Sequence, residues 1–146
     1  TNRYGGPYVI PRKRFDGWHQ GQAVYEKRDE YLYRVTKKGG RGGVAMSRSL
    51  GDSKYHQFGM IATPDITHRK LNGTEEFMII ACDGLWDVMT NRGAVAYVRE
   101  EMRKMEVTAA KITQKQVTKI AENMISAAIF DFESYDNVTV MVVFFK

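Results

Sequence analysis

The sequence predicts an α+β fold with antiparallel strand pairing, and the order of its apolar segments is the main reason. From residue 44 onward, three strand-like segments are followed by two helix-like segments and a last strand. Strands and helices gathered in separate runs are typical of this class, whereas regular alternation would indicate a parallel sheet. With 146 residues and 43% hydrophobic content, the chain is long enough for one domain with a sizeable core.

Uninterrupted or alternating apolar runs predict the strands. The candidate segments are 44–49, 61–71, 77–82 and 137–145. Runs such as Phe77–Cys82 are typical of strands buried in a core. Pro64 interrupts the second segment, and Asn72-Gly73 after it predicts a tight hairpin turn into the third.

Capping residues and helical spacing predict the two helices. The first begins after Thr90 or Asn91, and its apolar stripe comprises Ala94, Val95, Val98, Met102 and Met105. The second opens on Thr113-Gln-Lys-Gln116, a capping-box pattern. Its stripe comprises Val117, Ile120, Ala121, Met124, Ile125 and Ala128.

Residues 1–43 form a glycine-rich, basic segment that we expect to be mostly irregular, with short strands at 7–10 and 31–35. Residues 1–54 carry 12 Lys and Arg against 5 Asp and Glu, a net charge of +7, while the remainder carries −2. Such a surplus indicates either a surface that faces a phosphorylated or acidic ligand, or a solvated basic loop. The interleaved aromatics, Phe15, Trp18, Tyr25, Tyr31 and Tyr33, are compatible with stacking on single-stranded nucleic acid. No nucleic-acid-binding module accompanies them, which disfavours that use.

Composition limits where the protein works. No apolar run reaches the length of a membrane-spanning helix. Cys82 is the one cysteine, so an intramolecular disulfide is excluded and a reducing, intracellular location, cytoplasmic or nuclear, is favoured.

Two aspartates at strand ends are the strongest candidates for a functional site. Asp83 follows the apolar run that begins at Phe77, and Asp136 precedes the last one. If the two strands are neighbours, both carboxylates can converge on one cation, and ligands made only of oxygen suit Mg²⁺ or Mn²⁺. The alternative is that each aspartate only caps a turn at a strand end. Spacing alone does not decide between them.

Four motifs in order resemble those of the protein phosphatase 2C family, the metal-dependent Ser/Thr phosphatases. They are Gly43-Val-Ala-Met-Ser-Arg-Ser-Leu-Gly-Asp52, Thr63-Pro-Asp-Ile66, Glu76-Phe-Met-Ile-Ile-Ala-Cys-Asp-Gly-Leu-Trp-Asp-Val88 and Asp136-Asn-Val-Thr-Val140. The resemblance covers residues 44–146 well and is looser over 1–43, where family members carry a flap beside the substrate. It implies a layered sandwich of two antiparallel sheets flanked by helices.

The resemblance also implies a chemistry and roles for residues. A pair of Mg²⁺ or Mn²⁺ ions would lie in a cleft at one edge of the sandwich, where water attacks the phosphorus of phosphoserine or phosphothreonine in a protein substrate. Asp83 and Asp136 would bind one ion, and Asn137 would orient Asp136 or a bound water. Asp52 would brace the cleft through hydrogen bonds, and Arg48 is either the partner of such a carboxylate or a structural ion pair.

The family's first half has no counterpart here. The Asp-Gly whose carboxylate bridges both metals, the arginine that grips the phosphate and a proposed histidine acid are not recognisable, and Asp16-Gly17 stands in the wrong order to supply the first. We therefore expect the chain to be the C-terminal portion of a phosphatase domain, with a basic flap or insertion at 1–43 and the sandwich strands and helices at 44–146. Its missing N-terminal half would be a partner, and the chain alone would show little activity.

Two other functions remain open on the sequence. One is a non-catalytic, phosphatase-like scaffold whose basic flap binds a protein partner. The other is a binder of nucleic acid or anionic surfaces through residues 1–54, which salt-sensitive affinity would reveal.

Overall fold

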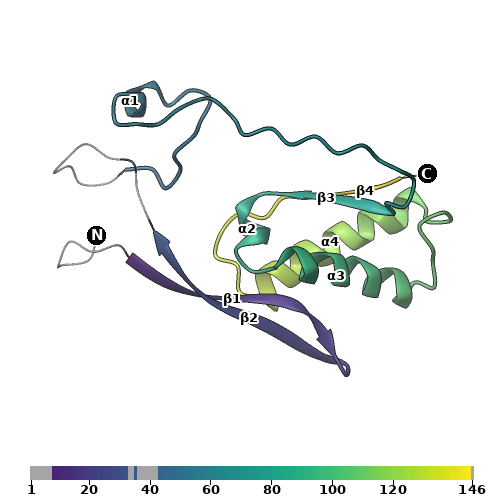
Figure 1. Cartoon of the computed structure of the whole chain (residues 1–146). Coiled ribbons are helices and arrows are strands. Elements are labelled where there is room, and N and C mark those ends of the chain that lie inside the picture. Colours follow the sequence, from purple (N-terminus) through teal and green to yellow (C-terminus); the bar gives the residue numbers. More distant parts are fainter. Residues whose placement is uncertain (1–7, 33–34, 36–42, 146) are drawn as a thin grey trace. The chain divides into compact units, whose positions relative to one another are not determined.

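A computed structural model describes residues 8–32, 35 and 43–145 (Figure 1). Within these residues, four strands and four helices follow one another as β1 Tyr8–His19, β2 Gln22–Leu32, α1 Ser53–His56, β3 Phe77–Ala81, α2 Asp83–Trp86, α3 Asn91–Lys104, α4 Gln114–Phe130 and β4 Val140–Phe144. The strands form two two-stranded antiparallel sheets, β1 with β2 and β3 with β4. The predicted α+β class is therefore confirmed.

The chain divides into two compact units. The first comprises residues 1–11 and 29–70, and the second comprises residues 12–28 and 71–146. The long hairpin of β1 and β2 contributes its tip to the second unit and its open end to the first. No helix among the described residues is both long and apolar enough to cross a membrane.

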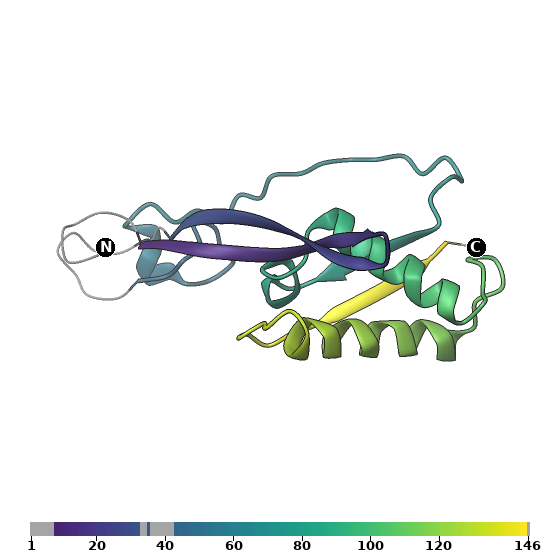
Figure 2. The ribbon, with the colours of Figure 1, turned by 90° about the horizontal axis from the view of Figure 1, so that it is seen from below.

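The second unit holds the main hydrophobic core. Helices α3 and α4 pack on one face of the β3–β4 sheet (Figures 1 and 2). The fully buried side chains at the centre include Leu85, Val98, Ile120 and Met124. Met102 is buried and Met105 packs against the same cluster, so the methionines of these helices serve packing.

Both helix starts agree with the prediction. The Thr90 side chain accepts a hydrogen bond from the Gly93 N–H at 2.9 Å, which satisfies a donor that the first turn of α3 leaves free. At α4, Thr113 and Gln116 form the complete capping box. Local sequence rules are sufficient at these two positions.

The expectation of a mostly irregular segment over 1–43 is wrong for residues 8–32, which form the β1–β2 hairpin. The two-residue turn at Gln20 and Gly21 has φ values of 50° and 78°, the left-handed conformation that matches the twist of paired strands. Most of β1 and β2 does not alternate apolar with polar residues, so the hydrophobic pattern did not predict these strands. Of the short strands predicted at 7–10 and 31–35, residues 8–10 and 31–32 are strand as expected, and Val35 forms an isolated bridge. Their remaining residues and the glycines at 5–6 and 39–42 lie outside the described residues.

Two other predicted strands do not form. Segment 44–49 makes only isolated bridges, Val44 with Val35 and Arg48 with Ile61, and residues 62–71 have no regular structure. Because Pro64 has no N–H and charged residues follow it, the segment gains little from pairing. The turn predicted at Asn72-Gly73 therefore does not connect two paired strands. It is a turn held by the Asn72 side chain, whose Oδ1 accepts from the Thr74 N–H at 3.1 Å.

Phe15, near the hairpin tip, packs inward rather than presenting its ring to a ligand, whereas Trp18 is 39% exposed. Phe15 is fully buried and stacks on Phe132 with ring centroids 4.7 Å apart, and Trp18 meets its edge at the same distance. The backbone of Phe15 also forms hydrogen bonds with the segment before α3. Its N–H donates to Val88 O at 2.7 Å, and its carbonyl accepts from the Thr90 N–H at 2.9 Å. Stacking of bases on Phe15 is therefore excluded.

Candidate metal centre

The antiparallel pairing of β3 with β4 brings the two candidate metal ligands to one end of a sheet. Ala81, the last residue of β3, pairs with Val140, the first residue of β4. Asp83 lies two residues after the first and Asp136 four residues before the second. The condition set in the sequence analysis, that the two strands are neighbours, is thus met.

Cys82 joins the two segments between the strands and the aspartates. Its N–H donates to Thr139 O at 3.2 Å, and its thiol accepts from the Thr139 N–H at 3.2 Å. The same thiol donates to Asn137 O, also at 3.2 Å. The sequence analysis used Cys82 only to exclude a disulfide, so it missed a residue that links the two segments of the site.

Gly84 allows a close backbone contact directly beside Asp83. The residue is buried, and a Cβ built on it would lie 2.2 Å from Asn137 O, a distance that no side chain tolerates. Its carbonyl accepts a hydrogen bond from Ser134 Oγ at 2.7 Å. Because it has no side chain, Gly84 therefore admits the backbone of the neighbouring segment.

The two carboxylates face solvent. Asp83 is exposed at the first position of α2, and its side chain has no hydrogen-bond or ion-pair partner among the described residues. Asp136 is exposed too, and one of its oxygens accepts from the N–H of Asn137 at 2.7 Å. The backbone of Asn137, rather than its side chain, makes this contact with Asp136.

A cavity of about 360 Å³ opens beside Asp136. It is lined by Arg12, Asp87, Val88, Glu133, Ser134, Tyr135 and Asp136. The guanidinium of Arg12, on β1, forms an ion pair of 2.9 Å with Asp87, which ends α2. Asp87 follows Asp83 by four residues, a helical spacing that places both on one side of the turn.

Exposed carboxylate oxygens such as those of Asp83 and Asp136 fit a hard cation such as Mg²⁺ or Mn²⁺. Two carboxylates are fewer than such an ion requires, since Mg²⁺ takes six ligands, several of them water. In the described part of the chain, no group of three or more His, Cys, Asp or Glu side chains could hold a metal. The arrangement therefore offers part of a coordination shell.

Asp52 and Arg48 belong to the first unit. Asp52 adopts a left-handed backbone with φ 51° just before α1, and its carboxylate accepts from Ser49 Oγ at 3.0 Å. Arg48 pairs with Asp65 at 2.7 Å, so of the two roles considered for it the structural ion pair is the one observed. The proposed bracing role of Asp52 stays a prediction.

Asp16, which precedes Gly17, has a structural role. It accepts a hydrogen bond from Thr90 Oγ1 at 2.5 Å and forms an ion pair with Arg92 at the start of α3. A carboxylate at a helix N-terminus is stabilising. These contacts agree with the expectation that Asp16 does not bridge the metals.

Comparison with known proteins adds an independent line of evidence. The family model described as "Protein phosphatase 2C" matches residues 25–130. "Probable protein phosphatase 2C 41" of Arabidopsis thaliana is 37% identical over 118 residues, which cover 79% of this chain and 31% of that protein. "Integrin-linked kinase-associated serine/threonine phosphatase 2C" of Bos taurus is 34% identical over 128 residues, covering 82% of this chain and 34% of that protein.

The chain thus spans about a third of the length of these relatives. No solved structure gave a significant match. The matched range includes Asp83 with its strand and α2, and also Cys82 and Gly84, but it ends before Asp136 and Asn137. The sequence motifs, the family model and the relatives agree that this chain belongs to the protein phosphatase 2C family.

Proposed function

We propose that the chain contributes part of the metal site of a Mg²⁺- or Mn²⁺-dependent phosphatase that acts on phosphoserine and phosphothreonine in proteins. The observation that carries the proposal is the placement of Asp83 and Asp136 at one end of the β3–β4 sheet. The hydrogen bonds of Cys82 and the close approach of Gly84 to Asn137 O hold the two segments together.

Each part of this end of the sheet has a chemical task in the proposal. Asp83 and Asp136 provide anionic oxygens for one ion of a binuclear centre, and Asn137 is a supporting residue. The bracing role that the resemblance implies for Asp52, which belongs to the first unit, stays a prediction. A bound divalent ion would neutralise negative charge on the phosphoryl oxygens. The remaining ligands have to come from outside the described residues, so we expect residues 1–146 alone to release little phosphate.

Metal binding by the chain tests the first half of the proposal. Titration of the purified chain with Mn²⁺, followed by electron paramagnetic resonance, should detect binding that Asp83→Asn weakens at least about tenfold, a change of about 1.4 kcal/mol. Asp131→Asn is the matched control, because Asp131 is also an exposed aspartate but lies at the end of α4. Equal binding by both variants would contradict the assignment.

Activity requires a complete domain. We propose to replace the matching segment of the Arabidopsis relative by this chain and to measure Mn²⁺-dependent phosphate release from a phosphothreonine peptide. Activity that falls by 100-fold or more in Asp83→Asn and Asp136→Asn supports the phosphatase. An inactive chimaera that still folds and binds a protein partner through residues 1–43 favours the non-catalytic scaffold.

A reducing location, cytoplasmic or nuclear, remains part of the proposal. Cys82 is a free thiol that both donates and accepts hydrogen bonds beside Asp83. Its oxidation would remove the donor and add bulk at this position. Treatment of the purified chain with hydrogen peroxide should therefore weaken Mn²⁺ binding, and Cys82→Ser should resist the treatment.

A further inference from the structure

The cavity beside Asp136 contains groups that the proposed metal site does not use. The loop between α4 and β4 contributes Glu133 and Tyr135 to its lining, and β1 contributes Arg12. Its volume of about 360 Å³ lies at the lower end of the range for ligand sites, about 300–1,000 Å³. The cavity therefore suits one or two side chains of a ligand better than a large cofactor.

Tyr135 stands out in this lining because it does nothing for the fold. It is 98% exposed, whereas Phe132 of the same loop stacks on the buried Phe15 with ring centroids 4.7 Å apart. Within the described part of the chain, Tyr135 has no hydrogen bond or ring contact. Tyrosine is enriched in binding surfaces, and the face of its ring attracts cations.

The loop that carries Tyr135 is fixed by its neighbour Ser134. The N–H of Ser134 donates to Ala128 O at 2.8 Å, and its Oγ donates to Gly84 O at 2.7 Å. On the other side of Ser134, Glu133 has a left-handed backbone with φ 59°, which is unfavourable for a residue with a side chain. Such strained residues cluster at functional sites. Glu133 and Tyr135 are therefore presented from a defined backbone.

The charges of the lining favour a basic ligand over an acidic one. Arg12 forms an ion pair of 2.9 Å with Asp87, so these two charges largely cancel. Glu133 is exposed and has no hydrogen bond or ion pair with the other described residues, so its charge remains. A lysine or arginine side chain would meet the carboxylate of Glu133 and the ring of Tyr135. An acidic side chain would instead have to displace Asp87 from Arg12.

We propose that this cavity binds a basic side chain of the phosphoprotein substrate next to the phosphorylated residue, and that Glu133 and Tyr135 determine this specificity. The specificity rests on the proposed function, which puts the phosphoryl group at the metal bound by Asp136. Because one extended residue spans about 3.4 Å, a cavity that Asp136 also lines is within reach of the neighbouring substrate residues. Tyr135 supplies the ring face, and Glu133 supplies the opposite charge.

The experiment uses the whole chain, isotope-labelled for NMR, and three phosphothreonine peptides as probes. The peptides differ only in the residues on either side of the phosphothreonine, which are Lys, Ala or Glu. In the presence of Mg²⁺, the lysine peptide should bind at least about tenfold more tightly than the glutamate peptide and shift the amide signals of Glu133 and Tyr135.

Two variants and two controls assign this preference to the cavity. Tyr135→Ala and Glu133→Gln should each reduce it at least about threefold, whereas Tyr135→Phe keeps the ring and should retain it. Glu106→Gln is the matched control for Glu133→Gln. Glu106 is also exposed and left-handed, with φ 53°, but it follows α3. The spectra of the variants report directly whether each remains folded.

Equal binding of the lysine and glutamate peptides overturns the inference, as does an absence of binding by all three peptides. A lysine preference that survives both Tyr135→Ala and Glu133→Gln overturns it as well. A preference for the glutamate peptide that Arg12→Ala removes would assign the cavity to acidic side chains instead. Mn²⁺ binding by the same variants separates this result from the proposed function, because metal binding without a lysine preference contradicts only the specificity. A lysine preference in a chain that binds no Mn²⁺ contradicts only the metal site.

Discussion

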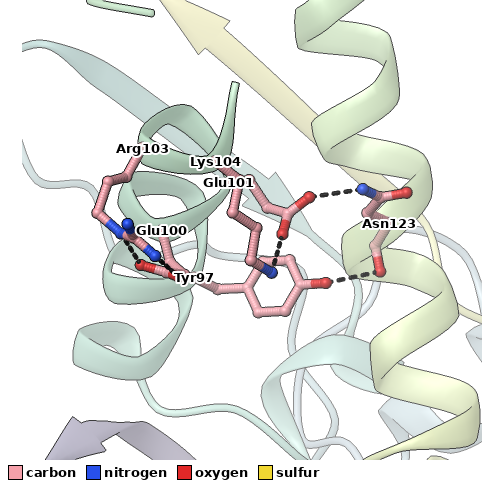
Figure 3. Close-up of polar contacts among 6 residues, drawn as sticks. All are labelled: Tyr97, Glu100, Glu101, Arg103, Lys104 and Asn123. Atoms are coloured by element: carbon pink, nitrogen blue, oxygen red, sulfur yellow. Dashed lines mark hydrogen bonds and ion pairs between the residues drawn. The ribbon is translucent and has the colours of Figure 1, made fainter. Parts of the chain in front are cut away.

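Two carboxylates of the second unit, Asp83 and Glu101, are placed in opposite ways. Asp83 is exposed at the start of α2 and has no partner among the described residues. Glu101, on α3, is only 4% exposed, and both of its oxygens are engaged (Figure 3). The comparison separates a carboxylate that stabilises the fold from one that is available to a ligand.

The network around Glu101 connects α3 to α4. Lys104 Nζ lies 2.8 Å from one carboxylate oxygen, and the Asn123 side-chain amide donates to the other at 2.5 Å. The hydroxyl of Tyr97 donates to the Asn123 carbonyl at 3.1 Å (Figure 3). A buried carboxylate is tolerated because these donors replace the water that it has lost.

The largest effect on stability should follow truncation of Glu101. Glu101→Ala leaves the Asn123 amide without its acceptor in a buried place, so we expect a loss of about 2–3 kcal/mol in the free energy of unfolding. Glu101→Gln keeps an acceptor and should cost about 1 kcal/mol. Urea denaturation followed by circular dichroism measures both.

Asp83→Ala is the counterpart of that experiment. Because Asp83 is exposed and unpaired, its removal should change the free energy of unfolding by less than about 0.5 kcal/mol, while Mn²⁺ binding is lost. A stability loss as large as that of Glu101→Ala would show that Asp83 is structural and would end the comparison.

The next effect concerns the residue after Asp83. In Gly84→Ala the added methyl group would lie 2.2 Å from Asn137 O, so the Asp136 segment must move away. We expect a destabilisation of about 2 kcal/mol together with weakened Mn²⁺ binding. Differential scanning calorimetry and the metal titration test the two parts, and Ser134→Ala, which removes only the hydrogen bond to Gly84 O, should cost less.

A pH-dependent effect should follow from Tyr97. Burial raises the pKa of Tyr97 to about 12, and the negative charges of Glu101 and Asp131 act in the same direction. The folded state therefore holds the phenolic proton more tightly than the unfolded state, where the pKa is near 10. This stabilisation is fully present below pH 10 and is lost as the pH rises from 10 to 12.

The loss over that range should approach 2 kcal/mol, since each pKa unit corresponds to about 1.36 kcal/mol. Urea denaturation at several pH values measures it. Tyr97→Phe should lower stability by about 1 kcal/mol at pH 8 and flatten the decline above pH 10. An unchanged decline in this variant would assign the effect to other groups.

Local signals in the sequence were sufficient for some features of this molecule. Thr90 and Thr113 mark helix starts because a capping hydroxyl acts within three residues. The placement of Asp83 and Asp136 at one end of a sheet follows from the antiparallel pairing of the two apolar runs, which the sequence analysis considered as a condition.

Other features depend on contacts between distant residues and were not predictable. The β1 strand is polar, and its place depends on the bonds of Phe15 to Val88 and Thr90. The role of Cys82 follows from the register of β3 with β4, which no local pattern specifies. For segment 61–71 the error is the reverse, since a strand was predicted but not found. Its apolar residues indicated a strand, but among the described residues no neighbouring strand pairs with it along its length.

The smallest effect should come from Glu100, the neighbour of Glu101 on α3. Arg103 donates two hydrogen bonds to it, at 2.8 and 2.7 Å, and lowers the pKa of Glu100 (Figure 3). This pair lies at the surface, where water competes for both groups. Glu100→Gln should therefore leave the midpoint of urea denaturation unchanged at pH 7, although its contacts with Arg103 are as short as that of Glu101 with Lys104. Because a lowered carboxyl pKa stabilises only above its ordinary range, any residual contribution should vanish as the pH falls below 4. A marked loss of stability at pH 7 would mean that burial is not what distinguishes the two glutamates, and that the same reasoning cannot be applied to Asp83.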